Sequence, residues 1–200
     1  MKRFVLACAL ALAACGQQQN AEQKQDEAFP VVSAPNYDSS IGPNGAAGIH
    51  SPLPMELDAI RAAAPNFMVA SVRDHIEGDP FTAITLSAGD EEVFRLFPTS
   101  DGARIHSIVT RSTQARGPDQ DIVGVATFAL APAEEVAFCL AETFDGSAGF
   151  ACSNSPGGQF WRVYRVPEGY DGPSEPFDAI DPDVLHDSTL VEMRWIAPRA

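Results

Sequence analysis

The strongest constraint on this chain is a processing signal at its amino end. Lys2 and Arg3 give a basic start, residues 4–12 are apolar, and the letters LAAC then end the run at Cys15. The apolar run is far shorter than the roughly 20 residues that a membrane-spanning helix needs. The pattern is typical of a secretory signal that ends in a lipoprotein cleavage box. We therefore predict that residues 1–14 are a lipoprotein signal peptide that takes no part in the fold.

Cleavage at this box would leave Cys15 at the new amino end, where its thiol would carry a diacylglyceryl group. Each buried methylene contributes about 0.8 kcal/mol, so several acyl chains would hold the protein on a membrane. Gly16 follows, and the absence of an aspartate there favours the outer membrane over the inner one. We predict a lipid anchor on the periplasmic side of the cell outer membrane. An ordinary cleaved signal without lipid is the alternative.

Composition divides the remaining chain into a tether and a domain. Residues 15–44 are rich in Gln, Asn, Ser, Pro and Gly, which predicts a flexible lipidated tether that spans roughly 30 Å as a random coil. Residues 45–200 are predicted to form a single globular domain. The net charge of −14 gives no electrostatic reason to bind nucleic acid or an anionic lipid surface, although it could attract a basic partner.

Two cysteines remain after the predicted cleavage and lipidation. Cys139 and Cys152 flank a turn at residues 145–149, and the envelope is an oxidising compartment. Neither cysteine has a second Cys or His at zinc-ligand spacing, and redox-active pairs normally lie closer together. We predict a structural disulfide that joins the end of a helix to the next strand and adds about 3 kcal/mol of stability.

Hydrophobic periodicity predicts an α+β fold, with an antiparallel sheet and two helices. Ser51 and Pro52 are typical of a helix start, and in the last strand Val191, Met193 and Trp195 alternate with charged residues. The pattern predicts two helix-plus-strands half-repeats that share one core, with Gly48 and Gly124 in matching places. The predicted helices span 53–64 and 132–140; the strands span 67–73, 81–87, 92–97, 104–111, 149–153, 159–166 and 188–196, with an insertion at 167–187.

The order of these features resembles that of the RpoE-regulated lipoprotein family, which consists of envelope proteins of unknown molecular function. The resemblance covers residues 45–197 and depends on the order of the motifs and on the cysteine spacing. It implies an outer-membrane lipoprotein linked to envelope stress, and it supplies no catalytic residues. The matching features are the box at Cys15, the helix 53–64, the hairpin from Phe81 through Glu91, Asp101-Gly102 before Ile105 and Ile108, the Cys139–Cys152 spacing and the closing strand with Trp195.

Arginine and aromatic residues gather on the last two long predicted strands. If these strands pair, the side chains would be cross-strand neighbours, and Trp, Tyr and Arg dominate protein-interface hot spots. A half-buried sheet with snorkelling arginines is the structural alternative. The candidate protein-binding face consists of Trp161, Arg162, Tyr164, Arg165, Arg194 and Trp195.

Other residue types that carry chemistry form no recognisable constellation in the sequence. The four histidines lie far apart, and each is expected to be a loop or strand-surface residue. An acidic loop could offer oxygen ligands to calcium, but its spacing departs from the EF-hand and a solvated loop is favoured. We predict no catalytic residues, no metal site and no cofactor. The histidines are His50, His75, His106 and His186, and the acidic loop holds Asp178, Asp181, Asp183 and Asp187.

These observations favour a non-enzymatic module that binds or scaffolds an unknown envelope protein. An inhibitor of a basic hydrolase such as lysozyme is one concrete version. A periplasmic hydrolase, or a carrier of a small ligand in a large apolar cavity, is the alternative.

Overall fold

The computed structural model describes residues 36–76, 78–170, 177 and 180–199. The predicted signal, Cys15 and most of the predicted tether lie outside the described residues. The elements in chain order are β1 (Ile41–Gly42), β2 (Gly45–Ala46), α1 (Leu57–Ala63), β3 (Met68–Ile76), β4 (Asp79–Ala88), β5 (Glu91–Pro98), β6 (Ile105–Thr110), the 3₁₀ turns Pro118–Gln120, Phe128–Leu130 and Ala133–Glu135, β7 (Phe138–Phe144), β8 (Ser147–Ser153), β9 (Phe160–Arg165), α2 (Pro182–Asp187) and β10 (Thr189–Ile196).

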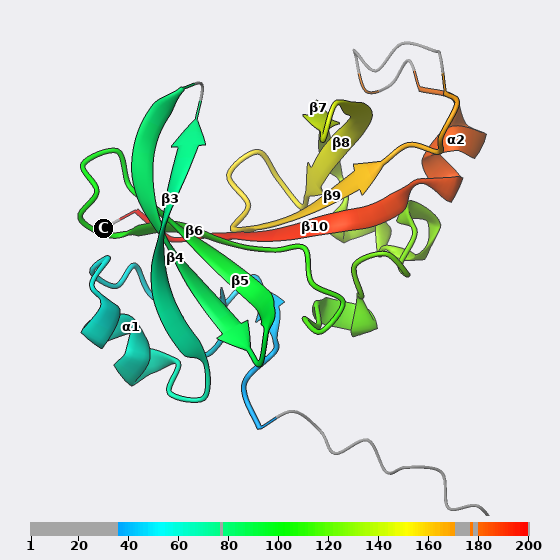
Figure 1. The fold of residues 1–200 in the computed structure, drawn as a ribbon. Coiled ribbons are helices and arrows are strands. Elements are labelled where there is room, and N and C mark those ends of the chain that lie inside the picture. Colours follow the sequence, from blue (N-terminus) through cyan, green and yellow to red (C-terminus); the bar gives the residue numbers. More distant parts are fainter. Residues whose placement is uncertain (1–35, 77, 171–176, 178–179, 200) are drawn as a thin grey trace, which may run out of the picture. The chain divides into compact units, whose positions relative to one another are not determined.

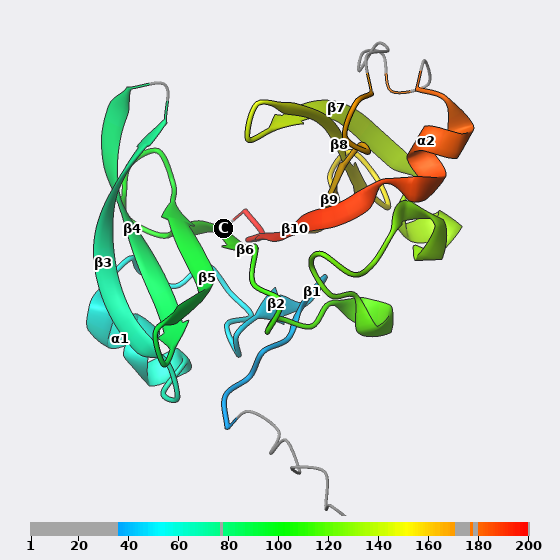
Figure 2. The same cartoon turned by 45° about the vertical axis from the view of Figure 1, so that its right-hand side comes forward.

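An antiparallel sheet of eight strands organises this part of the chain. Its strand order is β3-β4-β5-β6-β10-β9-β8-β7, and β1 and β2 form a separate two-stranded sheet. The last strands of the two halves, β6 and β10, pair at the centre, and the earlier strands follow outward in mirrored order (Figures 1 and 2). This mirrored order agrees with the predicted half-repeats at the level of the strands.

The core lies on one face of the sheet and draws on both halves of the chain. Phe94 of the first half and Phe150, Tyr164 and Trp195 of the second half are at most 1% exposed and belong to one hydrophobic cluster. Ile60 of α1 is buried in the same cluster, so this helix packs on the core face. The predicted α+β class is confirmed.

The first helix is shorter than predicted because its predicted first turn pairs with a strand. The backbone N–H of Ile105 donates to the carbonyl oxygen of Leu53 at 2.9 Å, and Pro54 forms a bridge with Arg104. Pro54 lacks an N–H and fits an extended segment better than the interior of a helix. The helix therefore begins only at Leu57, where the prediction was 53–64.

The predicted helix at 132–140 is wrong. Only Ala133–Glu135 forms a 3₁₀ turn, and the chain then enters β7. Every residue of β7 pairs with β8 across a two-residue turn in which Asp145 and Gly146 both have positive φ, the conformation that suits a tight hairpin. The hydrogen bonds between β7 and β8 outweigh the helix propensity of the Ala and Glu residues in this segment.

The folded part also begins earlier than the predicted boundary at residue 45. Ile41 of β1 is 2% exposed and belongs to the main core, and the ring of Tyr37 lies 4.7 Å from that of Phe67. The last residues of the predicted tether therefore pack with the domain.

The second helix lies inside the predicted insertion at 167–187. The Asp181 side chain accepts a hydrogen bond from the backbone N–H of Asp183 at 2.9 Å, and Pro182 occupies the first helical turn. An acidic N-cap followed by proline is a helix-start signal, so the sequence itself marks the beginning of this helix.

Three β-bulges interrupt the regular alternation of side chains. The strand register skips Val93 in β5, His106 in β6 and Val191 in β10. Each extra residue shifts the alternation by one position, so its two neighbours point to opposite faces, and residues three apart across the bulge share a face.

The bulge at Val191 places this residue on a different face of the last strand from the one predicted. Val191 packs with Phe144 and Val163 in a small cluster apart from the main core, whereas Met193 and Trp195 lie in the main core. The prediction that Val191 shares their face is wrong.

Candidate functional site

The face of the sheet opposite the core carries a groove of about 1020 Å³. It crosses the strands of the first half and continues onto β10, and its walls combine charged and aromatic side chains. Arg95 of β5 and Arg194 of β10 are both cross-strand partners of Val109 in β6, so the three occupy one row across the groove. The charged lining residues are Asp74, Asp79, Glu92, Arg95, Arg111, Glu192 and Arg194.

The first charged group of the groove is centred on Arg95. Its guanidinium donates to both carboxylate oxygens of Glu92, at 2.8 and 2.9 Å, and to Asp74 at 2.6 Å. Glu92 and Arg95 are three residues apart, and on a regular strand such residues point to opposite faces. The bulge at Val93 adds one residue between them, so their side chains reach the same face. Two hydrogen-bonded carboxylates outweigh the effect of partial burial and raise the pKa of Arg95.

The second charged group is centred on Glu192, whose side chain is only 3% exposed. This carboxylate accepts from the Nε atom of Arg111 at 2.7 Å and forms a second ion pair with Arg194. Arg194 also pairs with Glu142, and the guanidinium of Arg111 lies 4.4 Å from the ring centre of Phe144. One buried carboxylate thus fixes two arginines on the open face of the sheet.

The lowered pKa of Asp74 should make the stability of the fold depend on pH. Partial burial alone would raise its pKa, but the backbone N–H of His75 and the guanidinium of Arg95 lower it overall. A carboxyl whose pKa is lower in the folded state adds stability above its unfolded pKa of about 3.9, and that stability is lost as the pH falls through the folded value. We expect Asp74→Asn to cost up to about 1 kcal/mol in urea unfolding at pH 7 and less near pH 2. An equal cost at both pH values would contradict the assignment.

The six residues of the predicted protein-binding face do not form one face. Arg162, Tyr164 and Trp195 are each 1% exposed and point to the core side of the sheet. The other three, Trp161, Arg165 and Arg194, are half-buried on the open side. Strand alternation divides the six, because successive residues along a strand point to opposite faces of the sheet.

Arg162, the buried arginine of this set, forms ion pairs that have a structural role. The Nε atom of Arg162 donates to Asp121 at 2.6 Å, and its Nη2 atom pairs with Glu135. Burial would lower the pKa of Arg162, but the two carboxylates raise it overall; burial raises the pKa of Asp121 by more than Arg162 lowers it. This triad fixes the segment that leads into β7 against β9.

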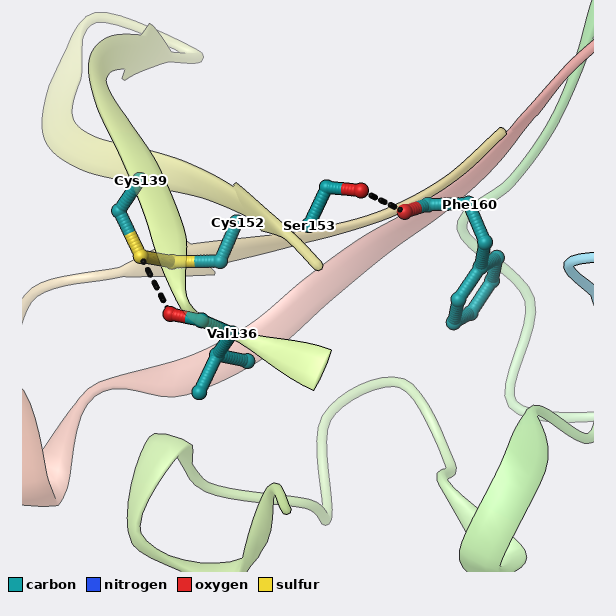
Figure 3. The surroundings of a disulfide bond; sticks show 5 residues. All are labelled: Val136, Cys139, Cys152, Ser153 and Phe160. Carbon is teal, nitrogen blue, oxygen red and sulfur yellow. Dashed lines mark hydrogen bonds between the residues drawn. A yellow bond between two sulfur atoms is a disulfide. The ribbon is translucent and has the colours of Figure 1, made fainter. Parts of the chain in front are cut away.

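Cys139 and Cys152 form a disulfide, as predicted, but between two strands. They are directly paired residues of β7 and β8, with their Cα atoms 4.1 Å apart. Figure 3 shows the bond beside Ser153, whose hydroxyl donates to the carbonyl oxygen of Phe160 at 2.7 Å. The disulfide joins the two strands of this hairpin, and the hydrogen bond ties β8 to the start of β9. The expected link between a helix end and a strand is wrong because Cys139 lies within β7.

All four histidines are exposed, in agreement with the prediction of surface positions. His106 lines the groove, and the Nδ1 atom of His186 lies 2.9 Å from a carboxylate oxygen of Asp187. Asp178 of the acidic loop falls outside the described residues, and Asp181 caps α2. Within the described ranges, no three His, Cys, Asp or Glu residues come together as a metal site.

The groove could not be predicted from the sequence, because the residues that form it lie far apart along the chain. Arg111 and Glu192 are separated by 81 residues, and only the pairing of β6 with β10 brings them together. A signal was present in the alternation of Glu192 with Arg194 in the last strand, which places two charges on one side of a strand that is otherwise apolar.

Comparison with known proteins identifies the fold but not the family. No protein-family model matches the chain, and no curated protein does. The crystal structure of the uncharacterized protein YfeY from Escherichia coli is similar, with a TM-score of 0.56 and 17% sequence identity, over 78% of this chain and 99% of that one. No helix in the described part of the chain has the length and apolar character to cross a membrane. The structural similarity to YfeY shows that the chain shares its fold with an uncharacterized protein.

Proposed function

We propose that this chain is a lipid-anchored envelope protein that binds another protein through the open face of its sheet, without an enzymatic step of its own. The observation that supports this most is the groove, where a row of arginines is held in place by carboxylates on a surface open to solvent. Side chains that are already ordered lose little entropy on binding, which favours recognition of a partner.

The amino-terminal sequence supports the envelope assignment. The cleavage box at Cys15 would attach the chain to the periplasmic side of the outer membrane, and the disulfide suits an oxidising compartment. The resemblance to the RpoE-regulated lipoproteins agrees with this location and suggests a link to envelope stress. The similar structure contributes the fold alone, because its protein is uncharacterized.

Lipidation is tested by labelling growing cells with a palmitate analogue. We expect label on the full chain and none on the Cys15→Ser variant, which should accumulate unattached to membranes. Cys8→Ser is the matched control and should be labelled normally, because the box ends at Cys15. Label on the Cys15→Ser variant would reject the proposed anchor.

Partner binding is tested by cross-linking from chosen positions in intact cells. A photoreactive residue is placed at Val109 in the groove and, as a control, at Arg61 on the exposed side of α1. We expect one protein to be captured from Val109, and the same protein to be absent from Arg61. Equal capture from both positions, or no capture from Val109, would reject the groove as the binding site.

A further inference from the structure

We propose that the occupant of the groove is a basic, extended segment of the partner, and that one of its lysine or arginine side chains lies between Asp74, Asp79 and the rings of Phe81 and Phe97. This inference rests on the proposed function, since it assumes that the groove binds a protein. It adds the chemical class of the partner and the place where the partner's charge is bound.

The charges on this face favour a cation. Three arginines and four acidic residues line the groove. Because each arginine is already paired, the carboxylate in excess determines the sign of the potential that a partner meets. The guanidiniums belong to Arg95, Arg111 and Arg194, and the carboxylates to Asp74, Asp79, Glu92 and Glu192.

One end of the groove combines the two kinds of group that bind organic cations. Asp74 is the cross-strand partner of Phe81, and the ring centres of Phe81 and Phe97 lie 5.8 Å apart. Asp79, at the start of β4, is exposed and forms no ion pair with any described residue. Carboxylates pair with ammonium and guanidinium groups, and aromatic faces attract them.

The size and the donors of the groove favour a polypeptide over a small cation. A volume of about 1020 Å³ is at the upper end of small-molecule sites, and the groove crosses several strands. A guanidinium has five N–H donors, and the hydrogen bonds of Arg95 to Asp74 and Glu92 use three of them. The remaining donors can bind backbone carbonyl oxygens of an extended segment.

The net charge of the whole chain also favours a basic partner. At −14 it attracts a basic segment from a distance and raises the association rate at low salt. This long-range effect is common to the whole surface, so a test must separate it from binding in the groove itself.

The test uses the full chain, purified in detergent from the cells that process it, and a fluorescent decapeptide of alternating lysine and serine. We expect saturable binding that weakens with salt, and no binding of the matching glutamate–serine peptide. Asp74→Asn with Asp79→Asn should raise the dissociation constant about tenfold, and Phe97→Leu should raise it several-fold. Asp58→Asn with Glu134→Gln removes two exposed charges elsewhere and should change it less than about twofold.

Each result decides the inference. Equal weakening by the two double variants would show a general charge effect and overturn it, as would spermidine competing as strongly as the peptide. Phe97→Leu keeps the test valid if the aspartate variant fails to fold. If cross-linking from Val109 captures a protein whose linked segment has no lysine or arginine, the inference is overturned while the proposed function stands; no capture from Val109 rejects the proposed function itself.

Discussion

Arg162→Leu is expected to lower the free energy of unfolding by about 3–5 kcal/mol, one of the two largest effects of a local change in this chain. The guanidinium is 1% exposed, and the side chain of Asp121 beside it is 7% exposed. Removing the arginine leaves the carboxylates of Asp121 and Glu135 close together without a cation. A buried charge without a partner costs far more than the intact pair contributes.

The cost should depend on pH in a direction that identifies its cause. Burial already raises the pKa of Asp121, and loss of Arg162 would raise it further. A carboxyl with a raised folded-state pKa destabilises the fold as the pH rises above its unfolded value of about 3.9. The deficit of the variant should therefore be largest near pH 7 and should shrink as the pH falls toward about 4, where the carboxyl groups take up protons.

Urea unfolding at several pH values, followed by tryptophan fluorescence, measures this deficit. Arg165→Leu is the matched control on the same strand, because Arg165 is half-buried and forms no ion pair with any described residue. We expect it to cost less than about 1 kcal/mol at every pH. A deficit for Arg162→Leu that is equally small, or one that does not change with pH, would show that the triad contributes little to stability.

Strand positions could be predicted from the sequence because alternation is a local property. The runs at 67–73, 92–97 and 188–196 each lie on a strand of the sheet, with ends that differ by a few residues. The turn at Asp145-Gly146 was also predictable, since these residues tolerate positive φ.

The predicted helix at 132–140 failed because its sequence allows two structures. Ala133, Val136 and Leu140 have helical spacing, but the segment also carries Phe138 and Cys139, which suit a strand. The neighbouring strand β8 decides between them, and a local pattern contains no information about that neighbour. Leu140 is 51% exposed on β7, so it does not face the core as predicted.

The candidate site was harder to predict than the fold because it depends on bulges and on distant pairing. A bulge is a single extra residue, and nothing in the letters around Val93 or Val191 marks one. Of the residues in the predicted face, Arg194 lines the groove. The sequence could not show that Arg162, on the neighbouring strand, points to the opposite face and is buried.

Reduction of the disulfide is the second large effect, and we expect it to lower the free energy of unfolding by about 3 kcal/mol. Cys139 and Cys152 are 13 residues apart, and the bond removes freedom from the unfolded chain over this loop. Among the described strands, β7 is at the edge of the sheet and pairs only with β8, so its register depends on few other contacts. The melting temperature should fall by about 6–12 °C in the presence of a reductant.

Cys139→Ala with Cys152→Ala is the control for this experiment. The double variant should be destabilised by a similar amount and should no longer respond to the reductant, because it has no bond to break. Amide hydrogen exchange should become faster in β7 and stay slow in β5, which has neighbours on both sides. Faster exchange in β5 as well would mean that the bond stabilises the whole sheet rather than its edge. If the reductant breaks the bond and the free energy of unfolding stays the same, the pairing of β7 with β8 alone holds this edge of the sheet.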